Sequence, residues 1–288
     1  MLTVTLVRAG IAVRRFLPDR LAHALAVAIG DGCWLLLGRR RRTLESNLER
    51  TVPGSSPAER ARLARATFRN LARCVADFLA APSMTRDRLL GLIDRSGLEH
   101  LDAALARGHG AMVITGHLGN FELAGLGLST LGYRCHTVME SIAPELDRLF
   151  ARYRSATGST VAPLEQGADA SRRALEEKDV LVLVADRAVK SRSIPVRFAG
   201  GRRALPSGPA ARAIAAGAPI VIGYVVLNPS TGGRRYLGVV RPEIPTDGLT
   251  AADIPRLVQE IADQLSEVVM QYPDQWFVFQ PDWMPDAC

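Results

Sequence analysis

From residue 97 onward, the chain alternates short β-branched runs with segments of helix length, and this alternation restricts the fold more than any other feature. The run Val180–Val184 is apolar at every position, which is typical of a strand buried on both faces. Strands are expected at 111–115, 134–139, 160–163, 180–184, 219–227 and 235–240, and helices at 98–107, 120–131, 144–156, 168–177, 207–216 and 251–272. The pattern predicts an α/β fold with a mixed, largely parallel sheet flanked by helices.

The residues before this alternation have helical patterns. Ser56-Pro57-Ala58-Glu59 combines a serine cap, a proline in the first helical position and a glutamate three residues after the cap, which together predict a helix start. That helix is expected to end at about Ala81, because Pro82 follows. We therefore expect a helical region at 1–96 and an α/β core at 97–288 within one continuous domain.

The positive charge of the chain is concentrated near its start. The net charge is +7, and residues 1–42 contain eight arginines against two acidic residues. These arginines interrupt apolar runs, and aromatic residues that could stack on bases are sparse there. The pattern favours a helix on an anionic membrane surface over a nucleic-acid partner, and it leaves a purely structural basic helix as the alternative.

The longest apolar stretch covers residues 21–37 and contains Asp31. It is shorter than the ~20 residues of a spanning helix, and a charge inside a span is costly. We expect an interfacial or core-packed helix, with a true span as the less favoured alternative, and no cleaved signal peptide. Four scattered cysteines without C-x-x-C spacing predict reduced thiols in a cytosol-facing protein and no metal framework.

Two expected strand ends carry polar residues that suit proton transfer. His117 follows the run 111–115, with Glu122 five residues later, and Asp186-Arg187 follows Val180–Val184. Ligands of open α/β sheets bind at the carboxyl ends of the strands, and a histidine there is suited to act as a general base. If the two strands are neighbours, Glu122 and Asp186 are competing candidates to orient the imidazole.

A basic segment at 148–154 ends in Arg154, which either binds a phosphate or other anion of a substrate or lies on a solvated helix face. Motifs of other enzyme classes are missing from the sequence, since it contains no G-x-S-x-G, no H-E-x-x-H and no Walker loop.

In combination, these segments resemble the lysophospholipid acyltransferase superfamily, and more narrowly the bacterial lipid A biosynthesis (lauroyl/myristoyl) acyltransferases, which include phosphatidylinositol mannoside acyltransferases. The segment Gly116–Glu122 carries the H-x4-E motif of this superfamily, with His117 and Glu122 as its two ends. The resemblance covers nearly the whole chain. Further matching segments are Asn47-Leu48 with Pro53, Phe150–Arg154 with Gly158, Ala185–Arg187, Phe198–Gly200, Pro206–Ala210 and Trp276–Trp283. Ala188 departs from the pattern, because many relatives have another acid there.

The resemblance implies roles for individual residues. His117 would be the base that deprotonates the acceptor hydroxyl, with Glu122 and Asp186 as the other catalytic residues. Substrate-binding roles are expected for Arg154, Arg187, Asn120 and Gly119. Arg187 or amides of the loop would meet the oxyanion.

The resemblance also implies an activity. We expect acyl transfer from acyl-CoA or acyl carrier protein to a hydroxyl of a membrane glycolipid, either a lipid A precursor or a phosphatidylinositol mannoside, without metal or cofactor. The expected location is the cytoplasmic face of the plasma (inner) membrane, with peripheral or weak anchoring. A thioester hydrolase that uses the same dyad and a non-catalytic lipid-binding protein are the alternatives.

Overall fold

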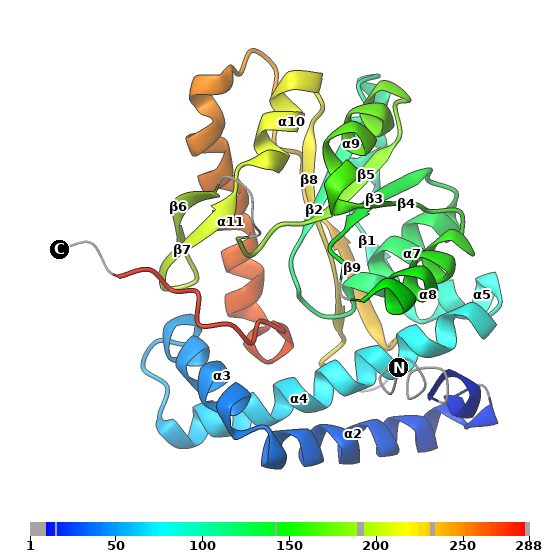
Figure 1. The fold of residues 1–288 in the computed structure, drawn as a ribbon, viewed down its shortest axis with the longest axis vertical. Coiled ribbons are helices and arrows are strands. Elements are labelled where there is room, and N and C mark those ends of the chain that lie inside the picture. Colours follow the sequence, from blue (N-terminus) through cyan, green and yellow to red (C-terminus); the bar gives the residue numbers. More distant parts are fainter. Residues whose placement is uncertain (1–9, 15, 142, 189–192, 231–233, 286–288) are drawn as a thin grey trace.

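The computed structural model describes residues 10–14, 16–141, 143–188, 193–230 and 234–285. Its central element is a seven-stranded sheet in the order β1-β9-β8-β2-β5-β3-β4, with helices on both faces (Figure 1). The strands of this sheet are β1 (Ile93–Ser96), β2 (Ala111–Thr115), β3 (Cys135–Met139), β4 (Thr160–Pro163), β5 (Val180–Val184), β8 (Ile220–Leu227) and β9 (Tyr236–Val240). All neighbours are parallel except β8 and β9, so the predicted mixed, largely parallel sheet is confirmed.

Alternate residues of the central strands face two apolar layers. On one face, Met112 and Ile114 pack with residues of α9, α10 and α11, and on the other face Ala111 and Val113 pack with residues of α6 and α7. The helices of these layers are α6 (Leu98–Ala106), α7 (Phe121–Leu131), α9 (Gly167–Glu176), α10 (Gly208–Ala216) and α11 (Ile254–Gln271). The largely apolar character of β2 and β5 follows from burial on both faces.

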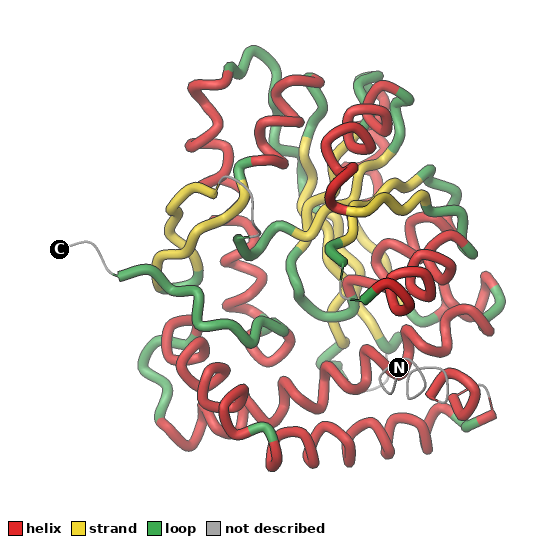
Figure 2. The backbone as a smooth tube through the Cα atoms, viewed as in Figure 1, coloured by secondary structure: helices red, strands yellow, loops and turns green. Residues whose placement is uncertain are grey.

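Three strands were not predicted from the sequence. β1 lies within the first 96 residues, which were expected to be helical, and it pairs in parallel with β9 at the edge of the sheet. β6 (Ser193–Phe198) and β7 (Gly201–Pro206) form a separate antiparallel hairpin beside α11, as Figure 2 shows. The sheet thus begins at Ile93, and the division at residue 96 into two regions stays a prediction.

The N-terminal helices form a layer along one side of the core (Figure 1). They are α2 (Asp19–Leu36), α3 (Gly38–Thr51) and α4 (Pro57–Ala80), followed by α5 (Arg86–Gly91), while α8 (Pro144–Ser155) lies between β3 and β4 in the chain. The predicted capping box at Ser56 and Glu59 opens α4. Two parts of the basic start lie outside the described residues: residues 1–9, which include Arg8 and an apolar run, and Arg15.

Helix α2 packs closely on α4 through small residues. Ala22, Ala26 and Gly30 are buried, and a Cβ atom on Gly30 would lie only 2.7 Å from the Cα atom of Arg69. Asp31 faces α4 as well, where it accepts hydrogen bonds from Arg69 and Arg65. The charge inside the apolar stretch is therefore paired within the protein.

The length and hydropathy of the described helices bear on the expected membrane contact. None of them is by itself both long and apolar enough to span a bilayer, and α2 with α3 meets that test only as a pair bent by 94°.

Asp77 joins the helical layer to the sheet. Its carboxylate is fully buried in α4 and accepts hydrogen bonds from the Tyr236 hydroxyl at 2.7 Å and from Arg235 at 2.9 Å, both on or beside β9. His23 of α2 lies 2.9 Å away on the same carboxylate. Burial raises the pKa of Asp77, but the hydrogen bond and charge of His23 and the charge of Arg235 outweigh it, so the pKa is lowered overall.

Candidate active site

The ends of two adjacent strands bring His117 and Asp186 together. β2 and β5 pair in parallel so that Thr115 lies opposite Val184, and the two polar residues each follow two positions later. The Nδ1 atom of His117 lies 2.7 Å from Oδ1 of Asp186, and the backbone N–H of His117 donates to Oδ2 at 2.9 Å. The two strands are therefore neighbours, and Asp186 reaches His117.

Asp186 is held as a carboxylate. It is buried, and besides His117 it accepts a hydrogen bond from the indole N–H of Trp276 at 2.8 Å. Burial raises its pKa, but the charge and hydrogen bonds of His117 and the hydrogen bond of Trp276 together lower the pKa to about 2. Because an ionised carboxylate only accepts, Nδ1 of His117 must carry the proton, which leaves Nε2 as the acceptor of the ring.

Glu122, the other candidate acid, pairs with Arg154 instead. Two hydrogen bonds join them, from Nε to Oε2 at 3.0 Å and from Nη2 to Oε1 at 2.6 Å. Arg154 also contacts the sulfur of Met139. Among the described residues, no hydrogen bond links Glu122 to His117, so Asp186 is the acid that orients the imidazole.

Gly119 shapes the loop between β2 and α7. It has a φ of +55°, and a Cβ atom there would lie 2.1 Å from the carbonyl oxygen of Val225. Its amide donates to the carbonyl oxygen of Gln275 at 2.8 Å. The close approach to β8 requires glycine, and the amide is engaged within the protein rather than directed to a substrate.

Asn120 was expected to bind substrate, but its side-chain hydrogen bonds all go to groups within the protein. Its side chain is buried and caps α7, with Oδ1 accepting from the amide of Leu123 at 3.1 Å. Its Nδ2 donates to the carbonyl oxygen of Cys74 and to the hydroxyl of Tyr236. Both N–H groups are therefore used inside the protein, and Asn120 positions the loop and helix instead.

A pocket of about 420 Å³ opens beside the imidazole. Its ionisable lining includes His117, Glu122, Glu140, Arg154, Arg187 and Arg212, and its apolar lining includes Leu126, Val138, Leu164, Val182 and Val184. The guanidinium of Arg187 donates to Glu140 at 2.7 Å on the same wall. The described part of the chain shows no ion pair for Arg212, whose pKa is lowered by burial. The pocket thus combines cationic groups near the histidine with an apolar interior.

The loop amides provide few free donors for an oxyanion. The backbone N–H groups of His117, Gly119 and Asn120 donate to Asp186, Gln275 and Val225, respectively. Of the two kinds of oxyanion donor expected from the sequence, Arg187 is therefore the better supported.

A second group of polar residues lies at the other end of the sheet. His136, Glu177 and Asp179 have ligand-type atoms within 4.8 Å of one another. Arg134 already occupies the space beside the two acids, at 3.3 Å from Glu177 and 3.1 Å from Asp179. The guanidinium supplies the positive charge there, so the cluster needs no metal ion to be balanced.

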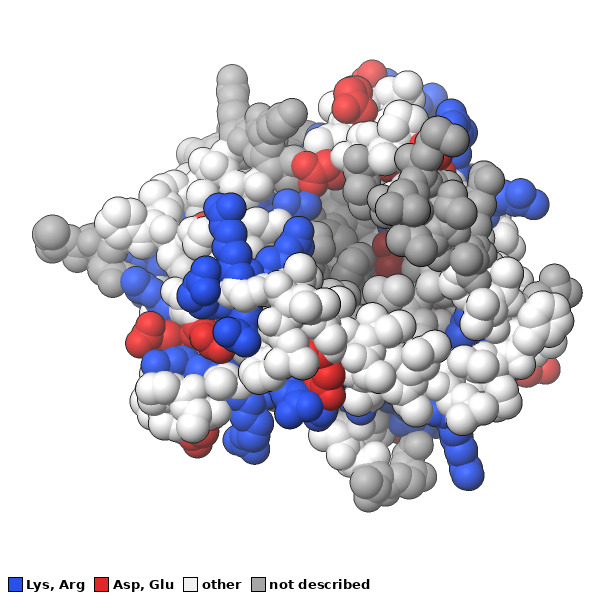
Figure 3. Space-filling model, turned by 60° about the horizontal axis from the view of Figure 1, so that its bottom comes forward, with Lys and Arg blue, Asp and Glu red and all other residues white. Residues whose placement is uncertain are grey.

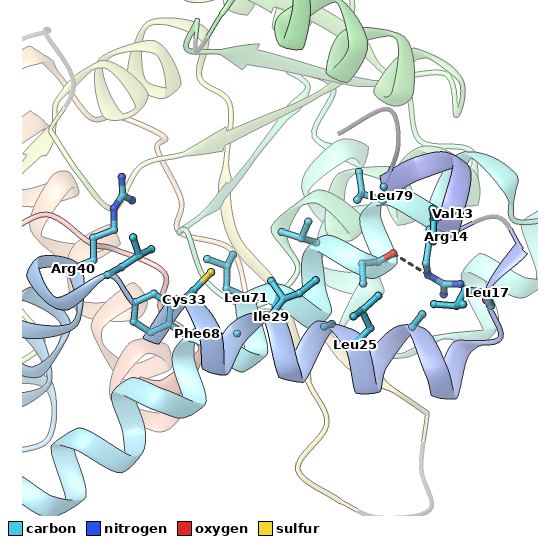
Figure 4. A pocket seen from close by; sticks show the side chains of 18 of the residues that line it. Val13, Arg14, Leu17, Leu25, Ile29, Cys33, Arg40, Phe68, Leu71 and Leu79 are labelled. Atoms are coloured by element: carbon cyan, nitrogen blue, oxygen red, sulfur yellow. Dashed lines mark hydrogen bonds between the residues drawn. The ribbon is translucent and has the colours of Figure 1, made fainter. Parts of the chain in front are cut away.

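A separate apolar groove of about 370 Å³ runs between α2 and α4. It shares no lining residue with the pocket beside His117. Leu25, Ile29 and Leu71 line it, and Arg14 and Arg40 lie at its two ends (Figure 4). The guanidinium of Arg14 donates hydrogen bonds within the protein, including one to the carbonyl oxygen of Ala76. This groove contains none of the candidate catalytic residues.

The contacts of the C-terminal segment with the dyad were not predicted from the sequence. Trp276 donates to Asp186, and the segment runs beside the His117 loop, with the amide of Phe277 donating to the carbonyl oxygen of His117 at 2.7 Å. Trp276 and Trp283 belong to a stretch that resembles the acyltransferases, but nothing local in the sequence relates them to the histidine.

Comparison with known proteins was made for the sequence and the structure. A family model described as bacterial lipid A biosynthesis acyltransferase matches residues 1–284. The phosphatidylinositol mannoside acyltransferase of Mycolicibacterium smegmatis is 32% identical over 249 residues, covering 84% of this chain and 79% of the relative. The protein of the same name from Mycobacterium tuberculosis (strain CDC 1551 / Oshkosh) is 30% identical over 250 residues, covering 84% and 77%.

A solved structure of a 1-acyl-sn-glycerophosphate (LPA) acyltransferase from Thermotoga maritima matches 87% of this chain and 97% of its own, with 10% identity and a TM-score of 0.39. That likeness is too weak to inform the fold or the site.

Proposed function

The chain belongs to the bacterial lipid A biosynthesis acyltransferase family, and on this premise we propose that it moves a fatty acyl group from a thioester to a hydroxyl of a membrane glycolipid, with His117 as general base. Membership makes the chain an acyltransferase, with an acyl donor and a lipid acceptor. The observation that carries the proposed mechanism is the His117–Asp186 pair at the wall of a pocket with an apolar interior.

The proposed reaction needs no covalent enzyme intermediate. Nε2 of His117 takes the proton of the acceptor hydroxyl while the oxygen attacks the thioester carbonyl. The tetrahedral intermediate collapses as the C–S bond breaks, and the proton passes from Nε2 to the leaving sulfur. Asp186 stabilises the imidazolium between the two transfers, and Arg187 is the proposed donor to the oxyanion.

The apolar interior of the pocket is the proposed site of the acyl chain. Leu126, Val138 and Val182 line it, and their contact with the chain would bury apolar surface. The Glu122–Arg154 pair lies on the same wall, where it fixes the guanidinium toward the pocket. We propose that Arg154 contacts an anionic part of a substrate and that Glu122 acts through Arg154.

We propose a phosphatidylinositol mannoside as the first acceptor to test, because the similar curated relatives carry that name. A lipid A precursor is the second, because of the family description. For the donor we propose an acyl thioester, carried by coenzyme A or by acyl carrier protein.

The surface of α2 and α3 supports a peripheral position on the cytoplasmic face of the plasma (inner) membrane. Leu21, Leu25, Ile29, Leu35 and Leu36 are large apolar residues of α2 that are at least half exposed. Figure 3 shows this side, with an extended uncharged surface along α2 and basic side chains gathered over α3. Apolar side chains beside arginines are suited to an anionic bilayer surface.

The proposal is tested by incubating the purified protein with each donor and each acceptor in vesicles and analysing the lipids by mass spectrometry. Acylated glycolipid formed only with donor and acceptor together is the expected result. Free fatty acid released at the same rate without acceptor would identify a hydrolase instead, and a thioester that is never consumed would identify a non-catalytic lipid-binding protein.

A further inference from the structure

Arg203 of β7 is a fully buried cation near the candidate dyad. Its guanidinium carbon lies 5.1 Å from the ring centroid of Trp276 and 4.9 Å from that of Trp283. Its contact with a carboxylate is a long one, 3.5 Å from Nη2 to Asp282, and Nε and Nη1 have no hydrogen-bond partner among the described residues. Burying a charge so weakly paired is costly, which calls for a reason beyond packing.

Trp276 connects this cation to the dyad. The edge of its indole faces Asp186, to which Nε1–H donates at 2.8 Å, while the ring face receives Arg203. The same Asp186 oxygen accepts the backbone N–H of His117. A cation over the ring is attracted to its π-electrons, and it polarises the indole so that the N–H becomes a stronger donor.

The charge of Arg203 also acts on the dyad directly. Asp186 alone favours a protonated imidazole, because an adjacent negative charge stabilises the cationic ring. A positive charge behind that carboxylate offsets part of this effect, and the electrostatic interaction between Arg203 and Asp186 is attractive. The cation therefore lies behind the carboxylate that orients the ring and offsets part of its negative charge.

We propose that Arg203 and Trp276 are positioning residues of the active site, which hold the Asp186 carboxylate in line with Nδ1 of His117 and keep Nε2 unprotonated at neutral pH. This inference rests on the proposed function, since it concerns the same base. Neither residue is expected to touch a substrate, because both are buried and neither lines the pocket.

Other charged groups around the dyad remain in place when Arg203 is changed. The Glu122–Arg154 pair of α7 and α8, the Arg187–Glu140 pair, and Arg212 of α10 line the pocket beside the imidazole. Asp282 contacts Arg203 and does not line the pocket. Because the variants keep these charged groups, their effect on the midpoint of His117 is common to the variants and the unaltered protein.

The test is the pH dependence of kcat/KM for acyl transfer in Arg203→Met and Trp276→Phe. Loss of the cation, or of the indole N–H, should favour the protonated ring and move the midpoint of the acidic limb up by roughly 0.5–1 pH unit. Arg203→Lys restores the charge and should bring the midpoint back toward its original value. The matched control is Arg241→Met, at an arginine that binds Glu267 and the carbonyl oxygen of Gln264 away from the pocket; its midpoint should not move.

A titration of the His117 ring by NMR makes the same comparison without turnover. If the unaltered protein transfers no acyl group, the proposed function fails, while the NMR midpoints still decide the role of Arg203 and Trp276. Folded variants with unchanged midpoints would overturn the inference. Should Arg203→Met not fold, Trp276→Phe decides alone: a raised midpoint supports the positioning role, and an unchanged one contradicts it.

Discussion

Nδ1 of His117 lies 2.7 Å from Oδ1 of Asp186 because the strands that precede them are parallel neighbours. Thr115 and Val184 lie opposite each other in these strands, and each of the two polar residues follows two positions later. The sheet itself therefore sets the geometry of the dyad, and the loops need to supply only the final orientation. Trp276 and the backbone N–H of His117 hold the second carboxylate oxygen. A change at any of these contacts should affect the base without removing it.

The lowered pKa of Asp186 predicts a defined acid response. A carboxylate with a lowered pKa in the folded state stabilises the fold above its unfolded pKa, and this contribution is lost as pH falls through the folded value. For Asp186 the window runs from 3.8 down to about 2. Denaturation curves should show that the stability difference between the unaltered protein and Asp186→Asn is full above this window and shrinks within it. A difference that stays constant across the window would contradict the assignment.

The Glu122–Arg154 pair predicts a defect of a different kind. Glu122→Gln leaves the partly buried guanidinium without its bidentate partner, so we expect kcat/KM to fall by about ten- to hundredfold. The midpoint of the acidic limb should stay close to its original value, because Glu122 contacts neither His117 nor Asp186 and its charge is partly exposed to solvent, which screens it. Arg154→Gln, alone and combined with Glu122→Gln, completes a double-mutant cycle. A shifted midpoint in Glu122→Gln would show that this acid acts on His117 after all.

The basic start of α3 predicts salt-dependent membrane binding. Arg39, Arg40 and Arg42 are exposed, and each arginine near an anionic surface contributes about 1 kcal/mol. Changing all three to glutamate should weaken binding to anionic vesicles by at least about 100-fold at low salt, and the difference should diminish as salt rises. The control is Arg173→Glu, at an exposed arginine of α9, on the opposite side of the molecule from α2 (Figure 1).

Equal losses in the triple variant and in Arg173→Glu would mean that α3 is not the contact. Leu35→Ser with Leu36→Ser should weaken vesicle binding at every salt concentration, because that contribution comes from apolar burial.

Asp77 predicts how firmly the helical layer is attached. Asp77→Ala removes the buried acceptor of the Tyr236 hydroxyl and one of the two carboxylates that bind the partly buried Arg235, and breaking a buried pair in this way costs about 3–5 kcal/mol. Urea denaturation measures the loss. Asp247→Ala removes the exposed partner of Arg107 and should cost less than about 1 kcal/mol. A similar small loss in both variants would show that Asp77 does not anchor the layer.

The parts of the fold predicted from sequence are those with a local signal. β5 is apolar at every position and β2 at every position but Thr115, and α8 and α9 between them are amphipathic. β1 has the sequence Ile-Asp-Arg-Ser and was missed, because an edge strand that is partly exposed does not differ from a polar turn in composition. The β6–β7 hairpin was missed for a related reason, since its strands contain prolines and arginines.

The site was predicted in part for the same reason. The sequence places His117 and Asp186 at strand ends, but only the order of the strands decides that Asp186, and not Glu122, reaches the ring. The cap role of Asn120 and the link from Arg203 through Trp276 depend on contacts between residues far apart in the chain. No spacing rule in a single sequence contains that information.

The most direct test of the account is single-turnover acyl transfer to a glycolipid by His117→Ala and Asp186→Asn, each compared with the unaltered protein. Loss of the base should reduce the rate by about 10²–10⁴-fold. Loss of the carboxylate should reduce it by about 10⁴-fold, the effect of the same change in a serine protease triad, where the wrong tautomer results. Circular dichroism should show both variants folded. Transfer at the unaltered rate by folded His117→Ala would contradict the account.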